Sequence, residues 1–131
     1  MIVRFVVLSK PTPKGGLNAR YFPKTGKVGL FYPTAVKRAQ ATFKAVAADE
    51  MRRSSYPLIG ARCTVHLHFY VTPCKNGKLI GDIDKLCRLA LDAMTGTVFE
   101  DDNLVVGLTS LKKPVGKGEV PRTEVSVSIA A

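Results

Sequence analysis

Six acidic side chains fall within 21 consecutive residues of the sequence: Asp82, Asp84, Asp92, Glu100, Asp101 and Asp102. Carboxylate oxygens are the ligands that Mg²⁺ prefers in proteins. In an extended segment Asp82 and Asp84 project to the same side about 6 to 7 Å apart, a separation at which two carboxylates share or bracket one divalent ion. Binding of an ion between carboxylates is therefore the first chemistry that these residue types and spacings predict.

A predicted helix after this pair brings further groups within reach. We expect Asp84 to cap the helix and Gly96 to end it. Its apolar face consists of Ile83, Leu86, Ala90, Ala93 and Met94. The helix carries the chain away by roughly 15 Å and the residues that follow span roughly 20 Å when extended, so Asp101 or Asp102 returns to the first pair. Arg88 lies one turn after Asp84, close enough to touch a phosphate held there.

Three carboxylates that bind a metal ion, with a fixed cation beside them for the phosphate, are the functional groups of a metal-dependent phosphodiesterase. The alternative is that each group has an ordinary structural role. Asp84 would then be only a helix cap, Asp92 only an ion-pair partner of Arg88, and Asp101 and Asp102 only part of a polar turn. The residue types by themselves leave both interpretations open.

The charge of the whole chain favours phosphate chemistry. The sequence has 20 Lys and Arg against 10 Asp and Glu, a formal net charge of +10. Up to Gly81 it has 14 basic and 2 acidic residues, whereas from Asp82 onward it has 6 basic and 8 acidic ones. A chain this basic is expected to bind a polyanion. Because carboxylates repel phosphates, an acidic cluster in such a chain predicts a metal ion between the two.

The elements that must position this site are strands and two helices. Apolar runs predict strands over residues 2–8, 62–71, 103–111 and 123–129. A helix is expected from Thr34, as its N-cap, to about Met51. Residues 11–33 are rich in proline and glycine and predict a long loop with room for a small hairpin at 24–27, while residues 112–122 predict a basic turn.

The long loop interleaves basic and aromatic residues, as nucleic-acid-facing segments do. Together with neighbouring cations it is expected to hold nucleic-acid backbones without reading bases. The residues predicted to do so are Lys10, Lys14, Arg20, Lys24, Lys27, Lys37, Lys44, Lys112 and Lys113. The alternative is a solvated loop whose aromatic residues pack back on the body. His66 and His68, on one face of the second predicted strand, are assigned no role.

Composition excludes several classes of protein. No stretch approaches the roughly 18 to 20 apolar residues of a membrane helix, and the N-terminus lacks the pattern of a signal peptide. We therefore expect a soluble, unexported, cytoplasmic protein, with neither a membrane nor a small-molecule cofactor as partner. The three cysteines, Cys63, Cys74 and Cys87, fit neither a disulfide framework nor a zinc site and are expected to be reduced.

The acidic stretch matches a known sequence motif. The run Asp82-Ile83-Asp84-Lys85-Leu86, then Leu91-Asp92-Ala93, then Val98-Phe99-Glu100-Asp101-Asp102 closely resembles the signature of the RusA family of Holliday-junction resolvases, which phages and prophages often carry. Pro13-Lys14, Tyr32-Pro33-Thr34 and the segment from Pro121 to Val125 are also similar to that family. The resemblance covers nearly the whole chain, but only the acidic stretch is specific.

The resemblance implies a single α+β domain over residues 1–131, with a small mixed sheet packed by two main helices. It implies a homodimer that nicks four-way DNA junctions in pairs with Mg²⁺, or Mn²⁺, as cofactor. The family's metal-binding acids fall on Asp82, Asp84 and Asp102, with Asp101 adjoining. Its catalytic lysine falls on Arg88, which keeps the charge but does not readily transfer a proton, and this leaves Lys85 as a substitute.

Two other functions stay open from the residues alone. A non-enzymatic nucleic-acid-binding protein would bind without nicking. A metal-dependent nuclease for other branched DNA or for RNA would cleave without preferring junctions. A dimer would need apolar contact surface, which the outward side of a strand or the apolar part of the long loop offers.

Overall fold

The computed structural model describes residues 1–130, and at its centre is a four-stranded mixed sheet. The strands lie in the order β1 (Ile2–Val7), β6 (Arg122–Ile129), β4 (Cys63–Val71) and β5 (Val105–Pro114). β6 is antiparallel to both of its neighbours, and β4 is parallel to β5. Every second residue of β4 from Cys63 to Val71 is buried, so the alternation predicted for this strand is confirmed.

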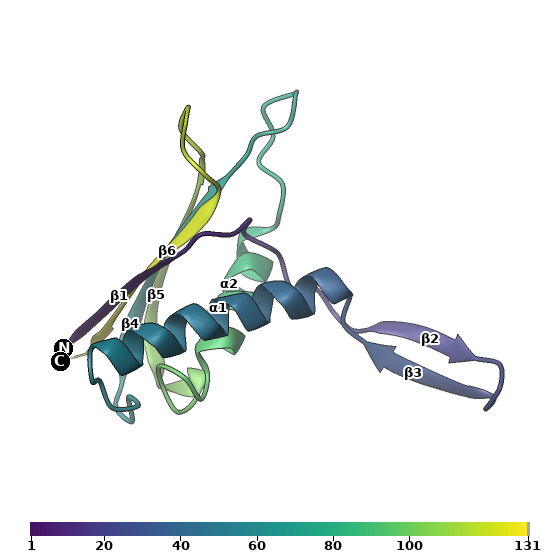
Figure 1. Cartoon of the computed structure of the whole chain (residues 1–131), viewed down its shortest axis with the longest axis horizontal. Coiled ribbons are helices and arrows are strands. Elements are labelled where there is room, and N and C mark those ends of the chain that lie inside the picture. Colours follow the sequence, from purple (N-terminus) through teal and green to yellow (C-terminus); the bar gives the residue numbers. More distant parts are fainter. Residues whose placement is uncertain (131) are drawn as a thin grey trace.

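Two helices cover one face of this sheet, and the other face stays open (Figure 1). α1 (Thr34–Arg53) packs on β1 and on α2, and α2 (Ile83–Met94) packs on β5. α2 is the crossover that the parallel pair β4 and β5 requires. Large, fully buried side chains fill the core between the sheet and the helices, among them Leu67, Phe69, Leu86, Met94 and Phe99. The predicted α+β class, with a mixed sheet and two main helices, is confirmed.

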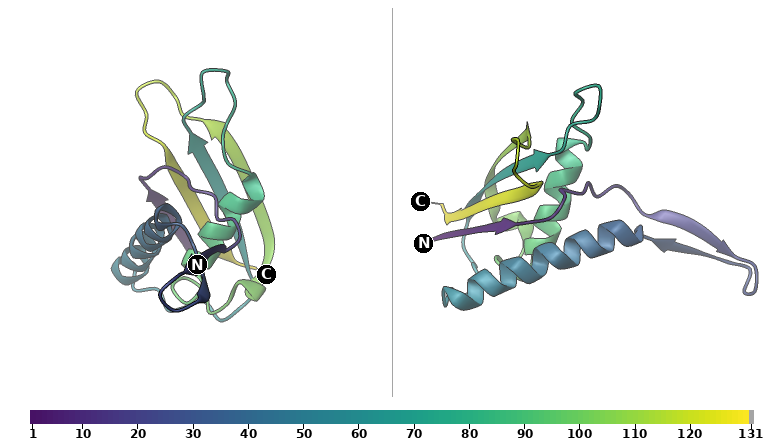
Figure 2. Two further views of the ribbon diagram at one scale, coloured as in Figure 1. Left: turned by 90° about the vertical axis from the view of Figure 1, so that its right-hand side faces the viewer. Right: turned by 45° about the horizontal axis from the view of Figure 1, so that its top comes forward.

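Most of the predicted long loop is a β-hairpin. β2 (Asn18–Phe22) pairs with β3 (Lys27–Phe31) across a turn in which Gly26 has φ +67°. The prediction of a turn at 24–27 is confirmed, but the paired strands extend well beyond it. The hairpin projects past the start of α1 and away from the sheet (Figure 1 and Figure 2). We call residues 18–31 the hairpin arm.

The N-cap residues of the two helices lie one and two residues before the predicted ones. Pro33 occupies the N-cap of α1, where its carbonyl accepts hydrogen bonds from the N–H groups of Val36 and Lys37, so the prediction of Thr34 as N-cap is wrong. Asp82 occupies the N-cap of α2 and its carbonyl accepts from Leu86 N–H at 3.0 Å. Asp84 is therefore a first-turn residue, and the predicted extended Asp82-x-Asp84 pair is wrong. α2 ends at Met94 before Gly96, which has φ +77°, as predicted.

Smaller corrections concern the edges of the elements. β5 extends to Pro114, so Lys112 and Lys113 lie in a strand and not in the predicted basic turn. Ile83 and Ile129, predicted to face the core, are 38% and 45% exposed. Within residues 1–130 no helix is long and apolar enough to span a membrane.

Candidate functional site

Three carboxylates and one guanidinium group line a single cavity between α2 and β5. The cavity has a volume of about 420 Å³. Its lining consists of Ile83, Asp84, Cys87, Arg88, Leu91, Asp92, Asp102, Leu108 and Ser110. The apolar members come from both α2 and β5, so the two elements form this open hollow together with the charged groups.

The helix accounts for three of the four charged groups. Asp84, Arg88 and Asp92 recur at intervals of four residues along α2, which places them on one stripe of the helix. The prediction that Arg88 lies one turn after Asp84 on the same face is confirmed. Leu86, Ala90 and Ala93 are buried on the opposite side and hold this stripe outward.

Asp102 reaches the cavity through the return of the chain after α2. Gly96 N–H donates to the Phe99 carbonyl at 2.8 Å, and Glu100 N–H donates to the Ile59 carbonyl at 2.9 Å. Val98 and Phe99 are fully buried and anchor the turn. A short 3₁₀ helix, η1 (Asp102–Leu104), then begins at the cavity. Of the predicted return of Asp101 or Asp102 to Asp82 and Asp84, the structure shows Asp102 beside Asp84 in one cavity, and Asp92 lines the same cavity.

Asp101 and Asp102 have opposite electrostatic environments. The Asp101 carboxylate accepts a hydrogen bond from Asn103 N–H at 3.0 Å, and this bond lowers the pKa of Asp101. The pKa of Asp102 is raised, chiefly by a hydrogen bond to the Asp101 side chain, then by desolvation and by the charges of Asp101 and Asp92. The raised pKa of Asp102 thus comes mainly from its neighbour Asp101, and the charge of Asp92 across the cavity adds a smaller contribution.

Asp82 and Lys85 lie beside the cavity and are not part of its lining. The Asp82 side chain is 71% exposed, and its Oδ2 is 3.5 Å from Lys85 Nζ. Among the residues that the structure describes, no three His, Cys, Asp or Glu side chains already lie close enough to hold one metal ion. The structure thus gathers Asp84 and Asp102 from the predicted metal set, with Asp101 adjoining, and leaves Asp82 at the rim.

Asp92 was predicted only as an ion-pair partner of Arg88, and the structure gives it another partner. Its Oδ2 is 2.7 Å from Lys14 Nζ. The spacing of Asp84, Arg88 and Asp92 was the available signal that Asp92 faces the same cavity. Its partner, 78 residues away in the chain, had no such signal.

A comparison with protein families matches residues 10–128 of this sequence to the model described as Endodeoxyribonuclease RusA. The chain belongs to the RusA family of endodeoxyribonucleases. The match covers nearly the whole chain and confirms the family predicted from the acidic stretch. None of the curated proteins compared with the sequence matches it.

Membership in the RusA family identifies the class of reaction that the protein catalyses. The protein is an endodeoxyribonuclease of the Holliday-junction resolvase type, which hydrolyses DNA and acts on branched substrates. RusA resolvases are generally dependent on a divalent metal. The oxygen donors of Asp84, Asp92 and Asp102 suit a hard divalent cation, so the chemistry of the cavity agrees with this dependence.

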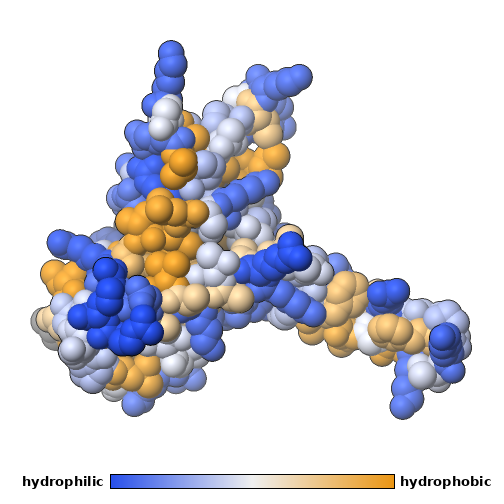
Figure 3. Space-filling view, in the orientation of Figure 1, coloured by the Kyte–Doolittle hydropathy of each residue, from blue (hydrophilic) through white to orange (hydrophobic). Residues whose placement is uncertain are grey.

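The basic residues predicted to hold DNA have three kinds of environment. Arg20, Lys24 and Lys27 lie on the exposed hairpin arm, where hydrophilic and hydrophobic residues are interleaved (Figure 3). Lys10 and Lys113, and on α1 Lys37 and Lys44, are also exposed. Lys112 Nζ donates to the carbonyls of Leu79 and Gly81 at 2.8 and 2.7 Å. Lys14 is buried. Its environment favours a role within the RusA domain over a phosphate contact.

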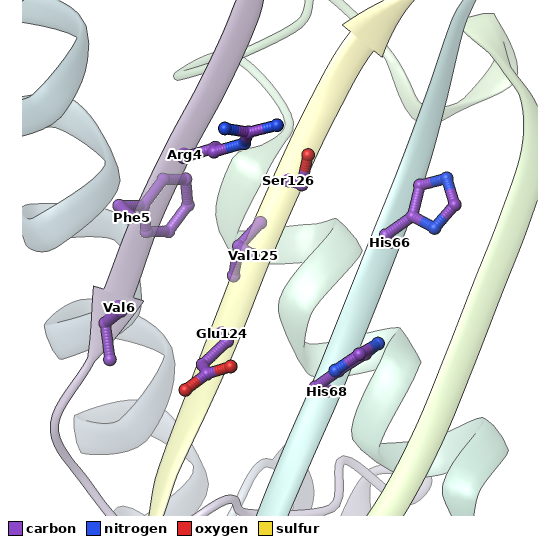
Figure 4. Close-up of a pocket in the computed structure, with 8 residues that line it drawn as sticks. All are labelled: Arg4, Phe5, Val6, His66, His68, Glu124, Val125 and Ser126. Carbon is purple, nitrogen blue, oxygen red and sulfur yellow. The ribbon is translucent and has the colours of Figure 1, made fainter.

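A second hollow lies on the open face of the sheet. It has a volume of about 580 Å³ and is lined by residues of β1, β6 and β4. His66, His68 and Glu124 point toward the viewer from this face, and the helices lie behind it (Figure 4). Glu124 is the one carboxylate of its lining. The hollow therefore lacks the donor set of the carboxylate cavity, and we do not place the RusA site there.

Proposed function

We propose that this protein is a Mg²⁺-dependent, structure-specific endonuclease that resolves Holliday junctions by paired symmetric nicks. It would act in DNA recombination and repair, in the cytoplasm of a bacterial or phage-infected cell. The observation that carries the proposal is the cavity in which Asp84, Arg88, Asp92 and Asp102 meet, in a chain of net charge +10 that belongs to the RusA family.

Asp82, Asp84 and Asp102 are the residues that would hold the ion, with Asp101 adjoining. When bound, Mg²⁺ or Mn²⁺ polarises a phosphate oxygen and lowers the pKa of a coordinated water. Asp84 and Asp102 already line one cavity, and the side chain of Asp82, the N-cap of α2, is 71% exposed beside them. DNA phosphate oxygens would supply the ligands that these three carboxylates lack.

Arg88 would bind the scissile phosphate. It lies between Asp84 and Asp92 on the α2 stripe, and its fork of N–H donors stabilises the charge that develops on the phosphate. Because a guanidinium group does not readily give or take a proton, any proton transfer falls to another group. Lys85 is the candidate, since its ammonium group is half-exposed and lies 3.5 Å from Asp82.

The hairpin arm and α1 would hold the DNA backbone. A two-stranded hairpin alone is marginally stable in water, so an arm that projects from the body gains stability from what it contacts. Arg20, in the middle of β2, and Lys24 and Lys27, at the turn, give this arm three cations. Lys37 and Lys44 add two more on the exposed side of α1. Contacts of this kind position the duplex without reading its sequence.

Paired nicks require two sites, and a homodimer supplies them about the near-twofold axis of a junction. Both surfaces expected from the sequence are exposed. On the hairpin arm, Tyr21, Val28 and Leu30 are 60 to 67% exposed, and on the open face of the sheet Ile2 and Val6 are 46% and 43% exposed. These side chains support a contact between two copies.

The decisive test is incubation with a labelled four-way junction, with and without Mg²⁺, beside a linear duplex of equal length. We expect paired nicks in the junction only, and only with the ion. Binding without nicking at any metal concentration would indicate a non-enzymatic nucleic-acid-binding protein. Equal cleavage of a flap, an RNA or the linear duplex would indicate a nuclease of another substrate class and overturn the assignment to junctions.

A further inference from the structure

Lys14 is the most buried charged residue of the described chain, with 6% of its surface exposed. Its Nζ is 2.7 Å from Asp92 Oδ2 on α2 and donates to Gln40 Oε1 on α1 at 2.8 Å. The same ammonium group lies 4.5 Å from the centre of the Tyr32 ring, just before α1. Asp92 and Gln40 thus accept two of its N–H donors, and the Tyr32 ring adds a cation–π contact.

Burying an ammonium group costs free energy unless the group is paired. We therefore expect these contacts to hold the Lys14 side chain in one position. The backbone supports it, because Lys14 N–H donates to the Lys85 carbonyl in the first turn of α2 at 3.0 Å. Lys14 therefore contacts α2 at two levels, by its backbone near Asp84 and by its side chain at Asp92. Four residues later the chain enters the hairpin arm.

The two members of the Lys14–Asp92 ion pair line different cavities. Asp92 lines the carboxylate cavity with Asp84, Arg88 and Asp102. Lys14 lines a second cavity of about 320 Å³ with Lys37 and Lys44 of α1. Lys14 is absent from the lining of the carboxylate cavity, so it does not reach the reacting groups, and its burial keeps it from a DNA backbone.

We propose that Lys14 is a positioning residue, whose buried ammonium group fixes Asp92 at the carboxylate cavity and joins α2 to α1 and to the base of the hairpin arm. The inference rests on the proposed function and adds a residue to it. Without Lys14, Asp92 would lose its neutralising partner and turn freely beside Asp102. Asp84 and Asp102, which share the cavity with Asp92, would then lose a fixed neighbour, while the exposed cations that bind DNA would stay intact.

The test compares Lys14→Met with Lys37→Met, and Lys117→Met serves as an exposed lysine control outside the site. We expect Lys14→Met to lower the single-turnover nicking rate at saturating DNA by about 10- to 100-fold. Mn²⁺ binding without DNA, followed by electron paramagnetic resonance, is expected to weaken by a similar factor. Junction affinity in chelator would change by less than about twofold, with an unchanged salt slope, whereas Lys37→Met would lower that slope by about 0.9.

Asp92→Asn and the double variant Lys14→Met/Asp92→Asn show whether Lys14 acts through Asp92. Each single change is expected to lower rate and Mn²⁺ affinity, and the double variant is expected to lose far less than the product of the two factors. A merely structural role would shift the melting temperature and leave Mn²⁺ affinity of the folded protein unchanged. If Lys14→Met fails to fold, Asp92→Asn carries the test, since its side chain keeps the size of the original.

Wild-type protein in the same assays separates the two proposals. A wild type without metal-dependent nicking would overturn the proposed function, together with this inference. An active wild type with Lys14→Met or Asp92→Asn at the same rate and Mn²⁺ affinity would overturn the positioning role alone. A loss of salt slope in Lys14→Met equal to that in Lys37→Met would make Lys14 a phosphate contact instead.

Discussion

Replacing Asp84 by asparagine separates DNA binding from DNA cleavage. Asp84 lies in the first turn of α2, exposed to solvent, and lines the carboxylate cavity with Arg88 and Asp102. Asparagine has nearly the same size and keeps one oxygen, so the change removes one negative charge and little else. We expect cleavage to be lost and junction binding to be kept or strengthened.

The magnitudes follow from this exposed position. Two unit charges about 6 Å apart in water interact by about 0.7 kcal/mol, so removing the repulsion between Asp84 and a DNA phosphate tightens binding by about threefold. An acid in the first turn of a helix stabilises it by about 0.3 to 1 kcal/mol. Asp84→Asn should therefore lower the melting temperature by no more than about 4 °C.

The loss in cleavage is much larger than either effect. Charge stabilisation by a bound metal contributes several kcal/mol to the transition state, so a weakened ion site lowers the rate on the order of 1,000-fold. Gel shifts in chelator, single-turnover nicking in Mg²⁺ and thermal melting of the same preparation measure the three quantities. Nicking at the wild-type rate, or clearly weaker binding by a folded variant, would refute the reasoning.

Further outcomes are expected. Asp82→Asn and Asp102→Asn should each abolish nicking and leave gel-shift affinity equal or higher, and full activity would remove that residue from the site. Junction affinity should fall steeply with salt, with a log-log slope of about −0.9 per phosphate contact, and a flat dependence would argue against DNA as the partner. Changing Arg20, Lys24 and Lys27 together to alanine should reduce that slope by about 2.7 in the same titration, and an unchanged slope would exclude the hairpin arm from the contact. Mixed dimers of wild type and Asp82→Asn should nick one strand without resolving the junction; complete resolution by them, or a monomer in sedimentation under active conditions, would contradict the dimer.

Local patterns in the sequence predicted the parts of this protein that depend on local hydrogen bonding. The alternation from Cys63 to Val71 is the buried face of β4. The spacing of Asp84 and Arg88 placed them one turn apart on α2. Such periods follow from backbone geometry, so they are readable without the fold. The acidic stretch also identified the RusA family, because its pattern lies within one continuous segment.

The tertiary structure decided what depends on segments far apart in the chain. It pairs Lys14 with Asp92 across 78 positions, so a lysine predicted as a DNA contact is buried between helices. It also makes Asp82 the N-cap of α2, which moves Asp84 out of the predicted extended pair and beside Arg88 and Asp102. The physical reason is that burial and ion pairing depend on which surfaces pack together. Neither composition nor periodicity specifies those surfaces.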